Sequence, residues 1–310
     1  MKLNDTDLSK LNRLFNQILT ETYALPRENL DATTFVPMQT GINPWVKSWT
    51  YKTISELGMA KIVSDGAKDL PPVSRAMKLA TNLLHTVGAS YSYTDQELEG
   101  WLFAGQDISR DEADTARRKI DELVDTLIYL GDATSGFTGL VNNTNVPIVT
   151  LAATGTGGSI AWNKKTLAQI TIDIQAMINT IRTNTKGANG KPTSIADSIL
   201  IPHDAFVHIS STPKNDTSDK QIIDHLKTVF AAQGIVNWNE CPALDAAGVG
   251  GTSRVMLYKR DVSCLSYVLP IPFRQKTPQE VGLAYIVNCF GRCGGTVFKR
   301  PTTAVYGDGV

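Results

Sequence analysis

The histidines and cysteines are the residues of this chain whose chemistry suits metal binding or nucleophilic catalysis. His203 and His208 are five residues apart, whereas two ligands on one helix face need a spacing of four. Cys289 and Cys293 form the closest cysteine pair, and a zinc site would need a second such pair. We therefore expect no metal site, and we interpret the histidines as structural and the cysteines as small buried apolar residues. The other members of the two groups are His85, His225, Cys241 and Cys264.

A glycine-rich segment, Thr154–Ser159, also invites a chemical interpretation, because loops of this kind can cradle phosphate groups. A phosphate-binding loop continues with Lys and then Ser or Thr after its last glycine, whereas Ser159 and Ile160 follow Gly158 here. We therefore interpret the segment as a flexible connector. Because no paired base and nucleophile is evident either, the sequence predicts no catalytic residue, no cofactor and no enzyme activity.

The composition places limits on the class of protein. The chain has 310 residues, which is enough for one large domain or two modest ones. Its 30 basic residues balance its 30 acidic residues, so it lacks the basic excess of a typical nucleic-acid-binding subunit. Charged residues make up 19% of the chain and apolar residues 42%, which suggests that other chains cover part of the surface.

The sequence gives no indication of a membrane or secretory destination. It has no apolar run of about 18 residues, and no apolar signal core follows Met1. Four cysteines do not make a disulfide framework in a chain of this length. These features favour synthesis in a reducing cytoplasm.

The first 44 residues read as a helix followed by extended chain. Apolar residues recur at helical spacing over residues 6–22, and Pro26 ends that pattern. Two further prolines, Pro37 and Pro44, and Gly41 predict extended chain over residues 26–44. Such a terminal segment is unlikely to fold alone, so we expect it to lie on another surface.

Residues 45–93 are predicted to form a long two-stranded flap. Residues 45–64 alternate in the way of a strand, broken at Gly58 and resumed from Met59 to Ser64. Asp65-Gly66 is a turn signal, and residues 82–93 are predicted to be the second strand. The alternating residues at the start are Trp45, Lys47, Trp49 and Tyr51.

A long helix is predicted from Thr94 to Leu130. Thr94 and Glu97 have the spacing of a capping box, and Gly131 is a C-terminal stop. A break near residues 107–109 is compatible with the pattern, and an unbroken helix would be about 54 Å long. The segment from residue 95 to 125 holds ten acids and four bases, which predicts an acidic outer face. The predicted apolar side contains Trp101, Leu102, Ala113, Ala116, Ile120, Leu123, Leu127 and Leu130.

The rest of the chain mixes helices and strands. Residues 164–183 have the clearest helical pattern, and residues 219–233 form a second helix that Ser218 would cap. Gly234 ends that helix, and mostly strands follow it. The predicted strands are Ser198–Pro202, Arg254–Tyr258, Cys264–Val268, Leu283–Cys289 and Gly295–Lys299.

A series of short motifs resembles, in order and spacing, the major capsid proteins of tailed bacteriophages with the Hong Kong 97-like fold. The resemblance covers residues 45–310. Each motif is short, and their order is what makes the likeness specific. The motifs are Leu57–Ser64, Asp69–Pro71, Tyr91–Tyr93, Glu97–Leu98, Gly131, Gly139–Asn142, Pro278–Glu280, Gly294–Thr296, Arg300–Pro301 and Tyr306–Gly309.

This resemblance implies an α+β, L-shaped subunit with five parts. Residues 1–44 would be the N-terminal arm and residues 45–93 the extended β-hairpin loop. Residues 94–192 would form a peripheral domain with the spine helix at 94–130 and a second helix at 164–183. Residues 193–270 would form an axial domain, and residues 271–310 would return to the peripheral domain as strands.

The implied function is that of a major capsid protein, which self-assembles into hexamers and pentamers of an icosahedral shell around a double-stranded DNA genome. The implied partners are further copies of the chain, portal, scaffolding and decoration proteins, and packaged DNA held without sequence readout. Assembly would take place in the host bacterial cytoplasm, and the final location would be the virion. Two alternatives stay open at this point: an encapsulin-like protein shell and an α+β hydrolase. Because the predicted arm helix starts so near Met1, we expect no cleaved scaffolding segment in this chain.

The arm and the flap are the predicted contact surfaces between subunits, because aromatic and large apolar side chains anchor interfaces. A chain without residues 1–25 would then fold but fail to form shells. The interface candidates are Leu8, Leu11, Phe15, Trp45, Trp49 and Tyr51.

Overall fold

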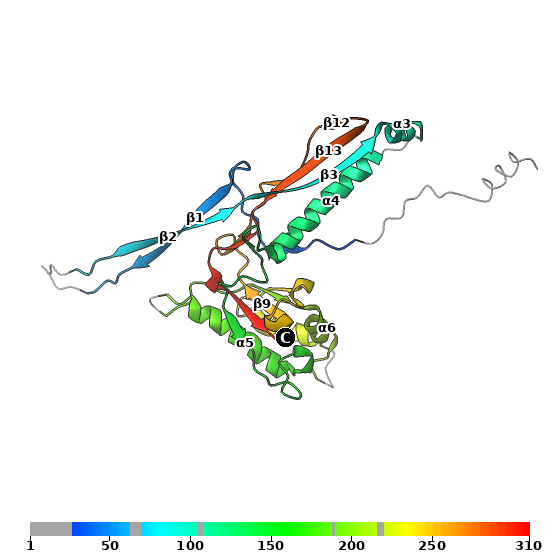
Figure 1. Cartoon of the computed structure of the whole chain (residues 1–310). Helices are drawn as coiled ribbons and strands as arrows, with labels where there is room; N and C mark the ends of the chain where they lie inside the picture. Colours follow the sequence, from blue (N-terminus) through cyan, green and yellow to red (C-terminus); the bar gives the residue numbers. More distant parts are fainter. Residues whose placement is uncertain (1–26, 63–69, 105–107, 188–189, 216–219) are drawn as a thin grey trace, which may run out of the picture. The chain divides into compact units, whose positions relative to one another are not determined.

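The protein is described by a computed structural model over residues 27–62, 70–104, 108–187, 190–215 and 220–310. The predicted helix over residues 6–22 therefore lies outside the described residues. Residues 31–310 form one compact unit, in which helices and strands alternate along the chain (Figure 1). Its short elements are α2 (Ala32–Phe35), β4 (Gly131–Asp132), β5 (Phe137–Thr138), β10 (Leu265–Tyr267), β14 (Thr296–Phe298), and the 3₁₀ turns at Trp162–Lys164, Pro242–Leu244, Val249–Gly251 and Pro301–Thr303.

A four-stranded antiparallel sheet is centred on β13 (Ala284–Cys293). On one side β13 pairs with β3 (His85–Thr94), and on the other with β11 (Ile271–Gln275) and β12 (Gln279–Val281). The helix α4 (Ile108–Tyr129) runs along β3 and β13 in Figure 1. Side chains alternate across a strand, so every second residue of β13 faces this helix. The buried residues shared by the helix and the sheet are Ala116, Ile120, Val87, Val287 and Cys289.

Two helices occupy the region of the predicted long helix. Helix α3 spans Asp95–Ala104, and α4 begins at Ile108. The predicted capping box is confirmed, because the Thr94 amide donates to a Glu97 carboxylate oxygen at 2.9 Å and the Glu97 amide donates to the Thr94 hydroxyl at 3.3 Å. Leu123 and Leu130, predicted on the apolar side, are 43% and 48% exposed. Leu127, also predicted on this side, is buried, and so are Val124 and Ile128, which were not predicted there.

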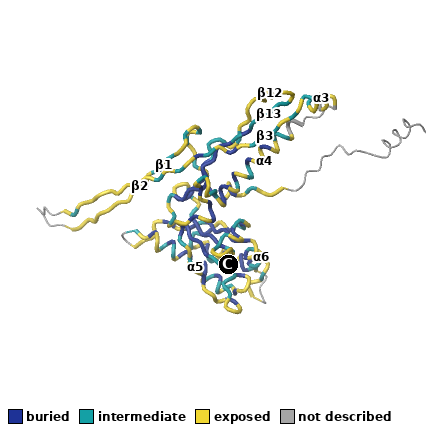
Figure 2. Tube along the Cα trace, in the orientation of Figure 1, coloured by how far each residue is buried: buried dark blue, intermediate teal, exposed yellow. Residues whose placement is uncertain are grey.

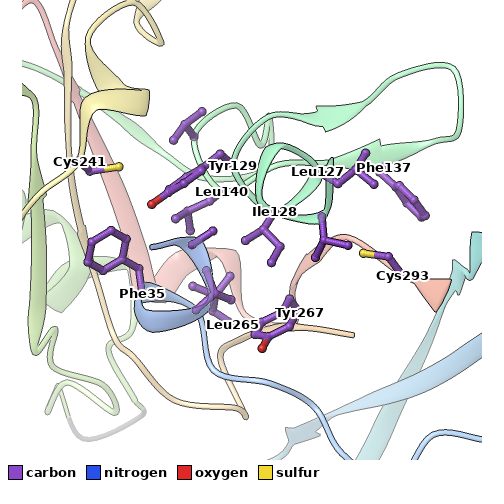
Figure 3. Close-up of a cluster of buried hydrophobic side chains, with 14 of the residues drawn as sticks. Phe35, Leu127, Ile128, Tyr129, Phe137, Leu140, Cys241, Leu265, Tyr267 and Cys293 are labelled. Atoms are coloured by element: carbon purple, nitrogen blue, oxygen red, sulfur yellow. The ribbon is translucent and has the colours of Figure 1, made fainter. Parts of the chain in front are cut away.

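The first core, which contains the C-terminal half of α4, collects side chains from distant parts of the chain. Figure 3 shows Phe35 of α2, Tyr129 of α4 and Tyr267 of β10 converging on it. The segment after α2 is held there by its backbone: the Gln39 amide donates to Tyr267 O at 2.8 Å, and the Tyr267 amide donates to Pro37 O. The end of the predicted extended arm, residues 31–39, is therefore part of the folded body and begins with a short helix.

A five-stranded mixed sheet separates the first core from a second one. Its strand order is β6–β15–β9–β7–β8, in which β6 runs parallel to β15 and β7 parallel to β8. Leu200 and Met256 face the first core, whereas Ile199 and Leu257 face the second. The strands are β6 (Ile148–Thr150), β7 (Ser198–Ile201), β8 (Asn237–Glu240), β9 (Arg254–Tyr258) and β15 (Ala304–Asp308).

The second core is built from three helices on the other face of this sheet. The first is α5 (Leu167–Asn184), followed by α6 (His203–Ser211) and α7 (Ile222–Ala231). The predicted helical face of α5 is confirmed, with Ile170, Ile174, Met177, Ile178 and Ile181 all buried. Thr166 and Gln169 form a capping box at its start, where the Thr166 amide donates to Gln169 Oε1 at 2.8 Å.

The predicted domain limits stay predictions. In the structure, helix α5 packs in the second core with β7 and α7. Strand β15 pairs with β9 and β6 in the five-stranded sheet. These contacts join segments far apart in the chain, which local sequence patterns do not encode.

The predicted hairpin exists, but its second strand is a different segment. Strand β1 (Ser48–Leu57) pairs antiparallel with β2 (Ser74–Leu83), with Ser48 opposite Leu83 and Leu57 opposite Ser74. Residues 82–93 belong mainly to β3 and join the sheet of β13. Residues 59–62, predicted as strand, carry no strand. The sequence of β2 shows no clear alternation, because neither of its faces is buried in a core (Figure 2).

Three smaller predictions also differ. Helix α6 was missed, although His203 and His208 lie within it. Helix α7 spans Ile222–Ala231 with Gln221 as its N-cap residue, so it begins later than the predicted helix over residues 219–233; the predicted cap, Ser218, lies outside the described residues. Strand β8 was not predicted, and the bounds of β11, β12 and β15 within the strand-forming range 271–310 were not predicted either, because these strands are short or lack a hydrophobic alternation.

Candidate subunit interface

The hairpin of β1 and β2 presents a stripe of exposed apolar side chains. Ile54 lies opposite Met77, and Lys52 lies opposite Leu79. Because side chains two residues apart on a strand share a face, Ile54, Met77, Leu79 and Leu83 all lie on the same face of the hairpin. They are 47%, 61%, 64% and 48% exposed. We call these four residues the hairpin stripe. The stripe was not predicted, because the alternation of Met77, Leu79 and Leu83 is short and is interrupted by Thr81.

The hairpin's flanking segments extend this apolar surface. Met59, Ile62, Leu70 and Val73 follow β1 or precede β2 and are all more than 60% exposed. Large contiguous apolar surface is rarely left open to water on a monomeric protein. Within the described residues, no helix covers either face of β1 and β2.

Trp49 and Tyr51 lie on the opposite face of the hairpin from the stripe. Their ring centroids are 5.6 Å apart and both residues are half-buried. The Tyr51 hydroxyl donates to Phe298 O at 3.4 Å, and burial raises the pKa of this phenol. These two predicted interface residues therefore already contact their own chain.

Trp45, the third predicted aromatic, is 63% exposed. It lines an open hollow of about 470 Å³ on the four-stranded sheet, together with Arg274, Lys276 and Phe290. The Lys276 ammonium lies 5.8 Å from the centroid of the Phe290 ring. Trp45 thus has the exposure that an interface residue needs. The other predicted interface residues, Leu8, Leu11 and Phe15, lie outside the described part of the chain.

The cysteines and histidines do not form a chemical site. All four cysteines are free and buried, and burial raises the pKa of Cys241 to about 12, so that its thiol stays protonated at neutral pH. His203 lies on the surface with Nδ1 2.5 Å from a Glu240 oxygen, and this hydrogen bond raises the pKa of the imidazole. Among the described residues, no cluster of three His, Cys, Asp or Glu side chains is placed to hold a metal ion.

A comparison with protein-family models identifies the chain. The model for "Major capsid protein" matches residues 58–310, which is most of the sequence. The chain belongs to this family. It is therefore a major capsid protein with a structural and not an enzymatic role, and the hydrolase alternative is overturned. No curated protein matches the sequence.

Solved structures give the same fold for this capsid protein. The capsid of Myoviridae phage XM1 aligns over 96% of this chain and 98% of its own, with a TM-score of 0.77 and 15% identity. The capsid of an empty GTA particle aligns over 99% of both chains, with a TM-score of 0.62 and 11% identity. A virus-like particle from Pyrococcus furiosus aligns over 88% of this chain and 90% of its own, with a TM-score of 0.54 and 12% identity. The predicted α+β, Hong Kong 97-like capsid fold is confirmed.

No helix in the described ranges is both long and apolar enough to span a membrane.

Proposed function

We propose that this capsid protein assembles with copies of itself into hexamers and pentamers of an icosahedral shell, which encloses a double-stranded DNA genome. The observation that carries the proposal is the hairpin stripe. Four large apolar side chains share one exposed face of a hairpin that neither core covers in the described part of the chain. A second copy that covered this face would remove its apolar area from water, which is favourable.

Many identical contacts make such a shell stable even when each contact is weak. In a closed symmetric assembly every subunit uses the same surfaces, so one complementary patch is repeated throughout. Each further contact made by a subunit that is already held becomes effectively intramolecular, which raises the overall affinity. In this proposal the arm (residues 1–44), Trp45 and the hairpin stripe are contact surfaces between subunits.

The remaining partners follow from the same proposal. Portal, scaffolding and decoration proteins would contact the shell, and assembly would take place in the cytoplasm of a bacterial host. The packaged DNA would meet the inner surface without sequence readout, since a formal net charge of zero gives no basic excess. No cofactor or metal is part of this function.

An encapsulin-like shell that encloses protein is the alternative, and its supporting observation is the structural similarity to the virus-like particle from Pyrococcus furiosus. The two proposals differ in the contents of the particle. Purified particles that protect DNA from added nuclease favour the phage capsid. Particles that hold a co-purified protein and no protected DNA favour the alternative.

The first test is assembly of the full chain, expressed alone and together with its neighbouring gene products. Negative-stain electron microscopy should find closed shells or capsomer rings in the soluble fraction. The matching measurement is sedimentation velocity, which separates particles from a monomer of 33.7 kDa. A monomer under every condition, with all neighbouring products present, would overturn the proposal.

A further inference from the structure

Arg292 is a buried cation that has no carboxylate partner among the described residues. It lies in β13 and is 8% exposed. Its guanidinium donates to backbone carbonyls: Nη1 to Pro44 O, and Nη2 to Val46 O at 3.0 Å and to Leu84 O at 3.2 Å. Burying a charge costs free energy unless hydrogen bonds offset the lost water. The side chain is therefore held by three neutral acceptors.

These acceptors lie at the two ends of the hairpin where its strands join the rest of the chain, around Val46 and Leu84. We call these two ends the roots of the hairpin. Val46 stands two residues before β1, and Leu84 directly follows β2. The roots are also joined to each other, because the Leu84 amide donates to Lys47 O at 2.9 Å. One side chain more than 200 residues further along the chain thus ties both roots to β13.

The chemistry of arginine suits this task better than that of other residues. Its planar guanidinium presents five N–H donors in fixed directions, so it can bind several carbonyls at once and define their relative positions. A lysine would carry the same charge on a single ammonium group, whose donors have no fixed directions. A methionine would fill the volume but would have no hydrogen-bond donor. Fixing the roots sets the direction in which the two strands leave the sheet.

We propose that Arg292 is a positioning residue that holds the hairpin at one angle to β13, so that the hairpin stripe meets a second copy in a single orientation. The part that concerns the second copy rests on the proposed function. The part that concerns the angle does not, and it is measured independently. A preset angle favours assembly because less orientational freedom is lost on binding.

The test measures the hairpin angle in the unassembled chain. Spin labels are attached to cysteines introduced at Lys78 on β2 and Asp114 on α4, both exposed, while the four native cysteines are buried and stay unlabelled. Pulsed electron resonance then gives the distribution of label distances. We expect a narrow distribution in the parent chain and one about twice as wide in Arg292→Met, since the roots lose three hydrogen bonds.

Arg260→Met is the matched control, because Arg260 is an exposed residue that follows β9, lies outside the proposed contact surfaces and makes none of the hydrogen bonds to the roots. It should keep the narrow distribution. Electron microscopy of the same chains should find at least about ten-fold fewer closed shells for Arg292→Met than for the control. A hairpin that takes many angles loses more orientational freedom when it binds a second copy, which weakens assembly.

An unchanged distance distribution in Arg292→Met would overturn the proposal, and so would a widened distribution with a normal yield of shells. If the parent chain forms no shells at all, the proposed function fails while the distance distributions still decide whether Arg292 positions the hairpin. If Arg292→Met does not fold, Arg292→Lys replaces it. This variant keeps the charge and should give a distance distribution of intermediate width, compared with Arg260→Lys.

Discussion

At the scale of single residues, a few buried charges hold segments that have little secondary structure of their own. Lys165 Nζ lies 2.5 Å from Asp173 Oδ2, and both side chains are almost completely buried. The indole Nε1 of Trp162 donates to the same oxygen at 3.1 Å. This cluster fastens the loop before α5, which includes the glycine-rich connector, to the second core. The glycines of the connector Thr154–Ser159 therefore lie in a loop whose C-terminal end is fixed by the Lys165–Asp173 ion pair.

Replacing Lys165 with Met should lower the free energy of unfolding by about 3–5 kcal/mol, because it leaves the Asp173 carboxylate buried without a cation. The double variant Lys165→Met/Asp173→Asn should be more stable than the single variant, since the amide is neutral and still accepts from Trp162. Urea unfolding followed by circular dichroism measures both. A double variant that loses as much stability as the two single variants added together would contradict this account of the pair.

Asp308 makes stability depend on pH. Burial acts to raise the pKa of its carboxyl, but the hydrogen bonds from Arg254 and from the Val249 amide outweigh it and hold this pKa below its usual value. The two Arg254 bonds measure 2.6 and 2.9 Å. A depressed folded-state pKa contributes stability above the unfolded-state pKa of about 3.9, and this contribution is lost as pH falls through the folded-state value.

We therefore expect the difference in unfolding free energy between the parent chain and Asp308→Asn to be largest near pH 7 and to shrink as the pH falls below about 4. Denaturant unfolding at pH 7, 5, 4 and 3 measures it. The control is Asp114→Asn, an exposed residue of α4, for which the difference should stay small throughout. A difference for Asp308→Asn that grows in acid would show that the sign is wrong.

At the scale of elements, the end of α4 depends on the backbone freedom of one glycine. Gly131 has a φ of +68°, and a Cβ at this position would lie 2.5 Å from Phe137 O. The chain turns back here to form β4 and β5, and the amides of Leu140 and Val141 donate to carbonyls in the last turn of the helix. The turn thus supplies partners that the helix end cannot find within itself.

Gly131→Ala should destabilise the protein by about 3 kcal/mol or more, because a left-handed backbone conformation is combined with a steric overlap. Gly136→Ala is the matched control: its φ is +73°, but a Cβ there would have no atom within 4 Å. It should cost only about 1–2 kcal/mol. Thermal unfolding measures the loss of stability in each variant. Equal losses would mean that the overlap between the new Cβ and Phe137 O is relieved without cost.

At the scale of the whole molecule, the two cores and the hairpin have different roles. The cores bury nearly all the large side chains of α5, β7 and β9, whereas the hairpin carries apolar side chains that are exposed among the described residues. Folding of the single chain therefore depends on the cores. The proposed assembly depends on the hairpin, so substitutions should separate the two properties.

The double variant Met77→Ser/Leu79→Ser should change the unfolding free energy by less than about 0.5 kcal/mol, because both side chains are exposed in the single chain. The yield of shells should nevertheless fall sharply. Lys78→Ser is the control, since Lys78 lies between them on the opposite face of β2. Sedimentation velocity gives the fraction assembled, and a normal yield for the double variant would exclude the hairpin stripe as a contact surface.

Local chemistry was enough to predict several elements from the sequence. The helical face of α5, the capping box at Thr94 and the stop at Gly131 each depend on residues within a few positions of one another. The motif order over residues 45–310 was also sufficient for the family and the fold. These features are encoded along the chain, so a close inspection of the sequence finds them.

Only the tertiary structure decided which segments meet. The partner of β1 is β2 and not residues 82–93, because an exposed hairpin lacks the alternation that a buried face imposes. The place of β15 beside β9, and the contact of Arg292 with Val46 and Leu84, join residues dozens to hundreds of positions apart. Such pairings follow from the packing of the whole chain, so the sequence alone could suggest aromatic residues as interface candidates but not the stripe on the other face of the hairpin.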